Sequence, residues 1–221
     1  MRKAIVIGGS GLVGKELLAL LCEDPNYVSV QYFGRSNVEK NHEKLDFIQT
    51  DFSDFNDIKD KINGDVLFST LGTTIKKAGS KDAQKKVDYD FQLEFATVAA
   101  QKNVESYVLI SSVGAHPNSR IYYSKLKGQL EQAIKEVDFK YKHILRPSLL
   151  SGKRKEGRWG EEFGIKLSGL LQFIPFFKKY RAIPAKTVAK AMLACVEKTD
   201  KISFEIIEAD HLFKLADKYR K

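Results

Sequence analysis

Tyr123 and Lys127 are the two residues of this sequence whose types and spacing most clearly suggest chemistry. They are four positions apart in a predicted amphipathic helix over 121–137, so both side chains would lie on one helix face. A phenol is a poor acid or base at neutral pH because its pKa is about 10, but a neighbouring ammonium lowers that pKa. Such a pair can donate or accept the proton that accompanies hydride transfer. About one such spacing is expected by chance in a chain this rich in tyrosine and lysine, so the pair needs support from its context.

Ser111 and Ser112 supply part of that support. They close a predicted strand over 107–111, just upstream of the helix that carries Tyr123 and Lys127. A serine hydroxyl at a strand end could polarise a substrate carbonyl beside the tyrosine. A strand-end serine, a helical tyrosine and a helical lysine together form an ordered set that suits chemistry on a carbonyl or an alcohol.

A glycine-rich segment near the N-terminus predicts a binding site for a dinucleotide. It has the pattern Gly-x-x-Gly-x-x-Gly, follows a short apolar strand over 3–8 and opens a helix over 12–21. Glycine permits a tight turn in which backbone N–H groups approach a pyrophosphate, and the helix N-terminus adds partial positive charge. A glycine turn that joins strand to helix without a ligand is the alternative. The residues predicted to contact the cofactor here are Gly8, Ser10, Gly11, Leu12, Val13 and Gly14.

Arg35 indicates which dinucleotide is bound. The second predicted strand, 27–33, runs into Gly34-Arg35-Ser36 without an acidic residue. Sites selective for NAD usually carry Asp or Glu here to bond the ribose hydroxyls, whereas arginine suits the 2′-phosphate of NADP. Arg35 therefore predicts NADP, with an ordinary surface arginine as the alternative.

Two more strand ends offer candidate contacts to the cofactor. Asp51 and Phe52, just past a predicted strand over 45–49, could reach the adenine, although this pair is equally suited to capping a helix. The fourth predicted strand, 65–71, ends in small and polar residues, and ligands of open α/β sheets bind at carboxyl strand ends. The residues predicted to line the crevice there are Leu71, Gly72 and Thr73.

The elements that must position these residues alternate along the chain. Further strands are predicted over 143–146 and 204–207, and further helices over 57–62, 82–102, 185–197 and 212–219. Strands separated by helices imply βαβ units, so we expect an α/β fold with a doubly wound parallel sheet, the Rossmann fold. A loop over 152–164 and an apolar stretch over 170–177 interrupt the pattern. We expect one domain over 1–221 whose part from about 151 covers the substrate pocket.

Composition limits the classes of function. The formal net charge is +9, but the lysines are scattered, so we expect no specific nucleic-acid binding. Two cysteines give no disulfide framework, and no spacing of histidine and carboxylate suggests a metal, so none is expected. The N-terminal apolar run is too short for a secretory signal, and no run approaches the roughly 20 residues that cross a bilayer. We therefore expect a cytoplasmic protein without integral membrane association.

Several motifs together resemble one family. The chain is similar to an atypical short-chain dehydrogenase/reductase, in the branch named for a Tat-interactive oxidoreductase. Beyond the glycine turn and Tyr123-x-x-x-Lys127-Gly128, the resemblance rests on motifs that extend to about residue 150. These motifs are Phe33-Gly34-Arg35, Leu71-Gly72-Thr73-Thr74, Lys77-Ala78-Gly79, Val87-Asp88-Tyr89-Asp90, Ser111-Ser112-x-Gly114-Ala115 and Leu145-Arg146-Pro147.

The resemblance implies bound NADP, with Ser112, Tyr123 and Lys127 as the catalytic set and Pro147 beside the nicotinamide. Tyr123 would be the acid or base, and Lys127 would shift its pKa and hold the cofactor ribose. One departure concerns Asp88, which stands where the broader superfamily has an asparagine in a proton relay, although the branch itself also has Asp there. The expected function is NADP-dependent oxidation or reduction of a small carbonyl or alcohol substrate. Two alternatives remain, an NADP-binding sensor or scaffold with little catalysis, and an epimerase or isomerase that holds NAD(P) tightly. The oligomeric state stays open.

Overall fold

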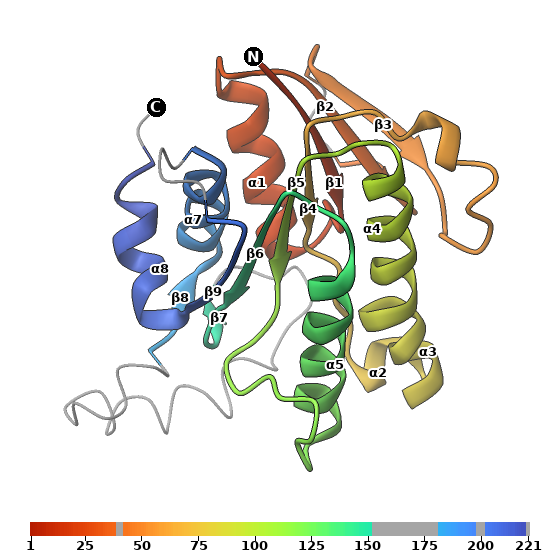
Figure 1. Ribbon diagram of the computed structural model, residues 1–221, viewed down its shortest axis with the longest axis vertical. Coiled ribbons are helices and arrows are strands. Elements are labelled where there is room, and N and C mark those ends of the chain that lie inside the picture. Colours follow the sequence, from red (N-terminus) through yellow and green to blue (C-terminus); the bar gives the residue numbers. More distant parts are fainter. Residues whose placement is uncertain (39–41, 152–180, 198–201, 220–221) are drawn as a thin grey trace.

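The computed structural model describes residues 1–38, 42–151, 181–197 and 202–219. Within them, a parallel sheet of seven strands has the order β3-β2-β1-β4-β5-β6-β9 (Figure 1). This sheet confirms the predicted doubly wound α/β fold. The strands are β1 (Arg2–Ile7), β2 (Tyr27–Gly34), β3 (Leu45–Gln49), β4 (Val66–Ser69), β5 (Ser106–Ile110), β6 (Tyr141–Arg146) and β9 (Phe204–Glu208).

Helices cover both faces of the sheet (Figure 1). One face packs against α1 (Leu12–Glu23), α7 (Ala185–Glu197) and α8 (Ala209–Ala216), and the other against α4 (Phe91–Gln101) and α5 (Tyr122–Glu136). Because the central strands are covered on both sides, β4 and β5 are buried along their whole length and carry nearly continuous apolar runs. The sequence pattern of these strands is thus a direct consequence of the two-faced core.

The strand order creates a topological switch point between the central strands β1 and β4. The chain winds outward from β1 through β2 to β3 and then returns to β4 on the other side of β1. Helices that follow β1 and β4 therefore leave the sheet in opposite directions, which opens a space beyond the carboxyl ends of these two strands. The glycine turn after β1 and the polar end of β4 both lie at this switch point.

The long helix predicted over 82–102 is interrupted. The structure has α3 (Lys81–Lys85), then a π-helical turn over Lys86–Asp90, and only then α4. A further short helix that the sequence analysis missed, α2 (Ile75–Ala78), precedes them. Its boundaries have local causes, because the Thr74 side chain accepts a hydrogen bond from the Lys77 N–H and Gly79 ends the helix at a φ of 91°. The π turn carries Asp88 into the interior, where it is fully buried.

The described C-terminal elements extend the sheet. β9 pairs with β6, and a separate short pair joins β7 (Leu150–Ser151) to β8 (Ile183–Pro184). The helix predicted over 57–62 is a single 3-10 turn at Lys59–Lys61, and the helix predicted over 212–219 begins earlier, at Ala209. The predicted loop over 152–164 and the apolar stretch over 170–177 lie outside the described residues.

Gly128 fixes the loop that connects β5 to α5. A Cβ atom at this position would lie 2.3 Å from the His116 carbonyl carbon and 2.4 Å from the Pro117 nitrogen. Both neighbours are backbone atoms, which cannot rotate away. The loop is also held by the His116 N–H, which donates to the Ser124 carbonyl at 3.0 Å. Because this loop lies between Ser112 and Tyr123, the contact at Gly128 sets their relative placement.

We predict that Gly128→Ala lowers the free energy of unfolding by about 1–3 kcal/mol or more, because the added methyl forces the loop away from α5. Urea unfolding measures this change. Gly72→Ala is the matched control, since the nearest atom to its added Cβ would be Asp88 Oδ1 at 3.5 Å, an ordinary contact. Equal free energies of unfolding for the Gly128→Ala variant and the wild type would show that the loop can shift away from α5 without a loss of stability.

Candidate functional site

The glycine turn after β1 is built from close backbone contacts. Gly8 has a φ of 83°, and a Cβ there would lie 2.5 Å from the Leu71 nitrogen. A Cβ at Gly14 would lie 2.3 Å from the Gly8 carbonyl oxygen. Gly8 and Gly14 are therefore required for the chain to enter α1 directly at the end of β1, beside the end of β4.

The N-terminus of α1 has the properties of an anion site. Its N-cap is Gly11, which provides no side-chain cap, and the first turn contains no acidic residue. The first N–H groups of a helix lack partners within the helix, and the helix dipole places partial positive charge there. The Val13 side chain is 4% exposed and so leaves only its backbone for a ligand, the Leu12 side chain is partly buried against the core, and Ser10 is exposed. These residues fit the pyrophosphate of a dinucleotide.

Arg35 lies at the same edge of the sheet. Ile7 of β1 is in register with Phe33 of β2, so Arg35 follows β2 just beyond the level of the glycine turn, and its side chain is exposed. Asp51, which follows β3, is also exposed. Hydrogen bonds from the Ser53 hydroxyl and backbone N–H lower the pKa of Asp51, and the charge of Arg35 contributes to this shift. Arg35 and Asp51 are thus close enough for their charges to interact.

Phe52, unlike the exposed Asp51, is buried in the core. It has a φ of 64°, is 4% exposed, and its ring packs against Phe91 and Phe95 in the core. The ring is thus a core element, and any contact of this residue with an adenine would involve its backbone.

The end of β4 is tied to the π turn. Both carboxylate oxygens of Asp88 accept from the Thr73 N–H, at 3.4 and 3.3 Å, and the Gln84 side-chain amide donates to the Thr73 carbonyl and to Asp88. Leu71 packs partly against the core and Gly72 is exposed. Thr73, one of the predicted crevice residues, is therefore held in place by Asp88 and Gln84. Gln84 was not predicted from the sequence, although its spacing of four positions from Asp88 is the spacing at which helical side chains meet.

Lys127 and Asp88 form a buried ion pair. The Lys127 ammonium lies 3.3 Å from Asp88 Oδ1, and the two side chains are 2% and 0% exposed. A buried charge needs a partner, because its desolvation is costly, and each of these groups provides that partner for the other. Tyr123, one helical turn before Lys127, is 39% exposed and so accessible to a ligand.

The two strand-end serines differ in their contacts. The Ser111 hydroxyl is hydrogen-bonded to Glu131 of α5. The Ser112 hydroxyl oxygen is buried and has no hydrogen-bond partner among the described residues. A buried hydroxyl without a partner is costly, and a ligand oxygen would satisfy it. Of the two serines, Ser112 is therefore the one whose hydroxyl, within the described part of the chain, has no hydrogen bond already made.

An ionic network supports this strand end. Glu131, which is 5% exposed, accepts two hydrogen bonds from Arg146 at 3.0 and 2.6 Å, and Arg146 also donates to Glu208 at 2.9 Å. The hydrogen bond to Glu131 raises the pKa of Arg146 above its ordinary value, so its charge is permanent. Pro147 follows directly, and its carbonyl accepts from the Val113 N–H at 3.0 Å, which places Pro147 beside the serines. Sequence analysis used Arg146 only as part of a motif and missed Glu131 and Glu208.

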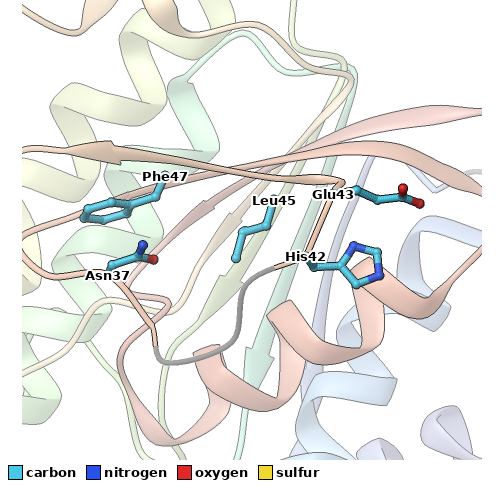
Figure 2. A pocket seen from close by; sticks show the side chains of 5 residues that line it. All are labelled: Asn37, His42, Glu43, Leu45 and Phe47. Carbon is cyan, nitrogen blue, oxygen red and sulfur yellow. The ribbon is translucent and has the colours of Figure 1, made fainter.

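A hollow of about 310 Å³ lies elsewhere, at the sheet edge formed by β3 (Figure 2). Asn37, His42, Glu43, Leu45 and Phe47 line it. None of the predicted site residues is among them, so this hollow is separate from the glycine turn and the Tyr123 region.

Comparison with known proteins agrees with the glycine turn and the sheet. A family model described as NAD(P)H-binding matches residues 8–199. The chain belongs to the NAD(P)H-binding family. It is 36% identical to "Protein FMP52, mitochondrial" of Saccharomyces cerevisiae over 70% of this chain and 68% of that protein. It is 31% identical to the protein of the same name in Candida albicans, over 96% of this chain and 97% of that protein.

Solved structures share the fold at low sequence identity. The enzyme WbmH of Bordetella bronchiseptica, solved with NAD+, has a TM-score of 0.71 and 15% identity, covering 98% of this chain and 79% of that chain. The UDP-N-acetylglucosamine 4-epimerase of Methanobrevibacter ruminantium has a TM-score of 0.69 and 17% identity, covering 96% and 80%. These likenesses support the Rossmann-type architecture.

The expectation of a cytoplasmic protein is wrong. Curated relatives from several organisms are all named as mitochondrial proteins, which points to the mitochondrion. The expectation rested on a short N-terminal apolar run and two cysteines, and neither feature distinguishes the cytosol from a mitochondrion. Among the described residues, no helix has the length and apolar character to span a bilayer.

We predict that Asp88→Asn lowers the free energy of unfolding by up to about 3–5 kcal/mol, because Lys127 stays buried without a counter-charge. Thermal or urea unfolding measures the loss. Asp90→Asn is the matched control in the same π turn, since its ion pair with Lys85 is exposed and should contribute at most about 1 kcal/mol. Equal, small losses in the two variants would contradict a stabilising role for the buried pair.

Proposed function

We propose that the protein is an NADP-dependent oxidoreductase of the short-chain dehydrogenase type, acting on a small carbonyl or alcohol substrate. The observation that carries this proposal is the arrangement around Ser112, whose buried hydroxyl lacks a partner among the described residues while Ser111 is bound to Glu131. Lys127 is buried on the facing helix and Tyr123 is accessible one turn earlier. The motif set over residues 8 to about 150 supports placing the chain in the atypical, Tat-interactive-like branch of that superfamily.

In this proposal, each of the site residues has a defined role in binding or in proton transfer. The turn over Gly8–Gly14 and the N-terminus of α1 bind the pyrophosphate, and Arg35 binds the 2′-phosphate. NADPH supplies the hydride when it is bound. Ser112 donates a hydrogen bond to the substrate oxygen, and Tyr123 exchanges the proton at that same oxygen. Pro147, whose carbonyl accepts from the Val113 N–H, would flank the nicotinamide on the side of β6.

Asp88 modifies the role of Lys127. An ammonium 3.3 Å from a buried carboxylate acts on its surroundings as part of a nearly neutral pair, so it stabilises a phenolate less than an isolated ammonium would. This contact favours a second candidate, a protein that binds NADP and catalyses little, as a sensor or scaffold. An epimerase that retains its cofactor is the remaining alternative, and dinucleotide that survives purification would favour it.

We predict that Tyr123→Phe lowers turnover at least about 100-fold and leaves NADPH affinity nearly unchanged, because only the proton-exchanging hydroxyl is removed. The assay follows NADPH absorbance with a panel of aldehydes, ketones and quinones. Tyr122→Phe is the control, since the Tyr122 hydroxyl donates to the Lys81 carbonyl at 2.8 Å. Full turnover by the Tyr123→Phe variant would refute the mechanism. Tight NADPH binding without turnover of any panel member would favour the sensor candidate.

We predict that the wild type binds NADPH about 5- to 150-fold more tightly than NADH, from roughly 1–3 kcal/mol of charge-assisted bonding by Arg35. Arg35→Asp should remove this preference. Lys218→Asp changes the net charge equally, at a position just after α8 and next to Tyr219, which is bonded to Asp24, and should preserve the preference. Calorimetric titration of both cofactors measures the ratio, and equal affinities in the wild type would exclude Arg35 as the selecting residue.

A further inference from the structure

A cluster of potential metal ligands lies away from the proposed cofactor site. His143 is in β6 and Glu205 is its register partner in the neighbouring strand β9, so their side chains project from the same face of the sheet. Cys195, in the last turn of α7, belongs to the helix that covers this face. One ligand atom from each of the three residues lies within 4.8 Å of the other two.

The cluster is largely closed to solvent. Cys195 is 2% exposed and His143 is 3% exposed, and the side chain of Glu205 is 16% exposed. The His143 Nδ1 atom lies 2.7 Å from Glu205 Oε1, which marks a hydrogen bond. The same side of the sheet is otherwise apolar around them, with Leu145, Val108 and Ile207 in the adjoining core. Three ionisable groups thus meet in a region where isolated charges are costly.

We propose that His143, Cys195 and Glu205 bind a zinc ion. Thiolate, imidazole and carboxylate are the three ligand types of protein zinc sites, and the thiolate disfavours Mg²⁺ and Ca²⁺. Zinc with bonds of about 2.0–2.3 Å in a tetrahedral arrangement places its ligand atoms about 3.3–3.8 Å apart. Separations of up to 4.8 Å must therefore close by at most about 1 Å, and the 2.7 Å contact between His143 Nδ1 and Glu205 Oε1 must open by about 0.6 Å if both atoms bind the ion.

Charge balance supports a divalent ion. The thiolate and the carboxylate each carry one negative charge and the imidazole is neutral, so a divalent cation makes the buried site neutral. Binding releases the proton of the Cys195 thiol to solvent, and the His143 ring keeps its one proton on the nitrogen that does not bind the metal, so affinity falls as pH falls. The partly exposed side of Glu205 leaves a path to solvent, and water would complete the coordination.

The distance of the zinc site from the proposed reacting atoms indicates a structural role. His143 lies in the amino-terminal half of β6, whereas the glycine turn follows the carboxyl end of β1, so the metal lies away from the proposed reacting atoms. A metal held by β6, β9 and α7 joins the edge strand of the sheet to the helix that covers it. We assign the site a structural role, in which zinc stabilises this C-terminal part of the fold. No metal was expected from the sequence, since His143 and Glu205 are 62 positions apart and show no recognisable ligand spacing.

Cobalt(II) titration of the reduced, metal-free protein tests the proposal, because a cobalt–thiolate bond gives a charge-transfer absorption band and a tetrahedral site gives strong visible bands. We expect saturable binding of one Co²⁺ per chain, displacement by Zn²⁺, and a higher Tm with Zn²⁺. Cys195→Ala should abolish the charge-transfer band and the Tm increase. Glu205→Gln should weaken Co²⁺ binding at least 10-fold.

Cys22→Ala is the matched control, because Cys22 is also buried but lies in α1. It should leave the cobalt spectrum unchanged. The site is overturned if the wild type shows no saturable charge-transfer band, or if Cys195→Ala retains the band. NADPH titration of the Cys195→Ala variant checks that it is folded, and unchanged NADPH affinity there separates failure of the metal site from failure of the proposed function.

Discussion

The whole arrangement depends on the close approach of three backbone segments at the switch point of the sheet. The Gly8 backbone lies against the end of β4, and α1 begins so near that a Cβ on Gly14 would meet the Gly8 carbonyl oxygen at 2.3 Å. A side chain at Gly8 or Gly14 would clash here, and the Thr70 hydroxyl, which donates to the Ile7 carbonyl at 2.9 Å, fills the remaining space. The same contacts that join β1, α1 and β4 therefore position the candidate anion site, and the match to the NAD(P)H-binding family begins at Gly8.

A second layer of constraint comes from buried polar groups at the carboxyl ends of β4, β5 and β6. Asp88 joins Lys127 of α5 to the residues after β4, and Glu131 joins Ser111 to Arg146. Each network connects α5 to strand ends, so the helix that carries Tyr123 is held by charge and hydrogen bonds as well as by packing. The paired charges in these networks favour one arrangement, because separating either pair would leave a buried charge without a partner. The accessible Tyr123 and the Ser112 hydroxyl, which has no partner in the described part of the chain, are set within this rigid frame.

The sequence predicted what depends on local patterns and missed what depends on contacts between distant segments. Buried strands such as β5 and helices such as α7 follow from short apolar runs and amphipathic spacing, and Gly8–Gly14 has a recognisable motif. The break at Asp88 was not predictable from helical periodicity, because a single extra residue in a π turn leaves that periodicity almost unchanged. Partners of Lys127, Ser111 and His143 lie far away in sequence and emerge only when the sheet is assembled. The mitochondrial names of the relatives could not be predicted from the motifs, because those motifs determine the fold and the cofactor site and not the compartment.

A crystal structure of the protein with NADP+ tests the central claim most directly. The account predicts the pyrophosphate on the backbone N–H groups at the start of α1, the 2′-phosphate on Arg35, and the nicotinamide between Pro147 and Tyr123. It also predicts that the α1 N-terminus and the Asp88–Lys127 pair keep their positions, because both are preformed. A dinucleotide bound elsewhere, for example in the hollow beside β3, or no saturable binding of either dinucleotide, would contradict it.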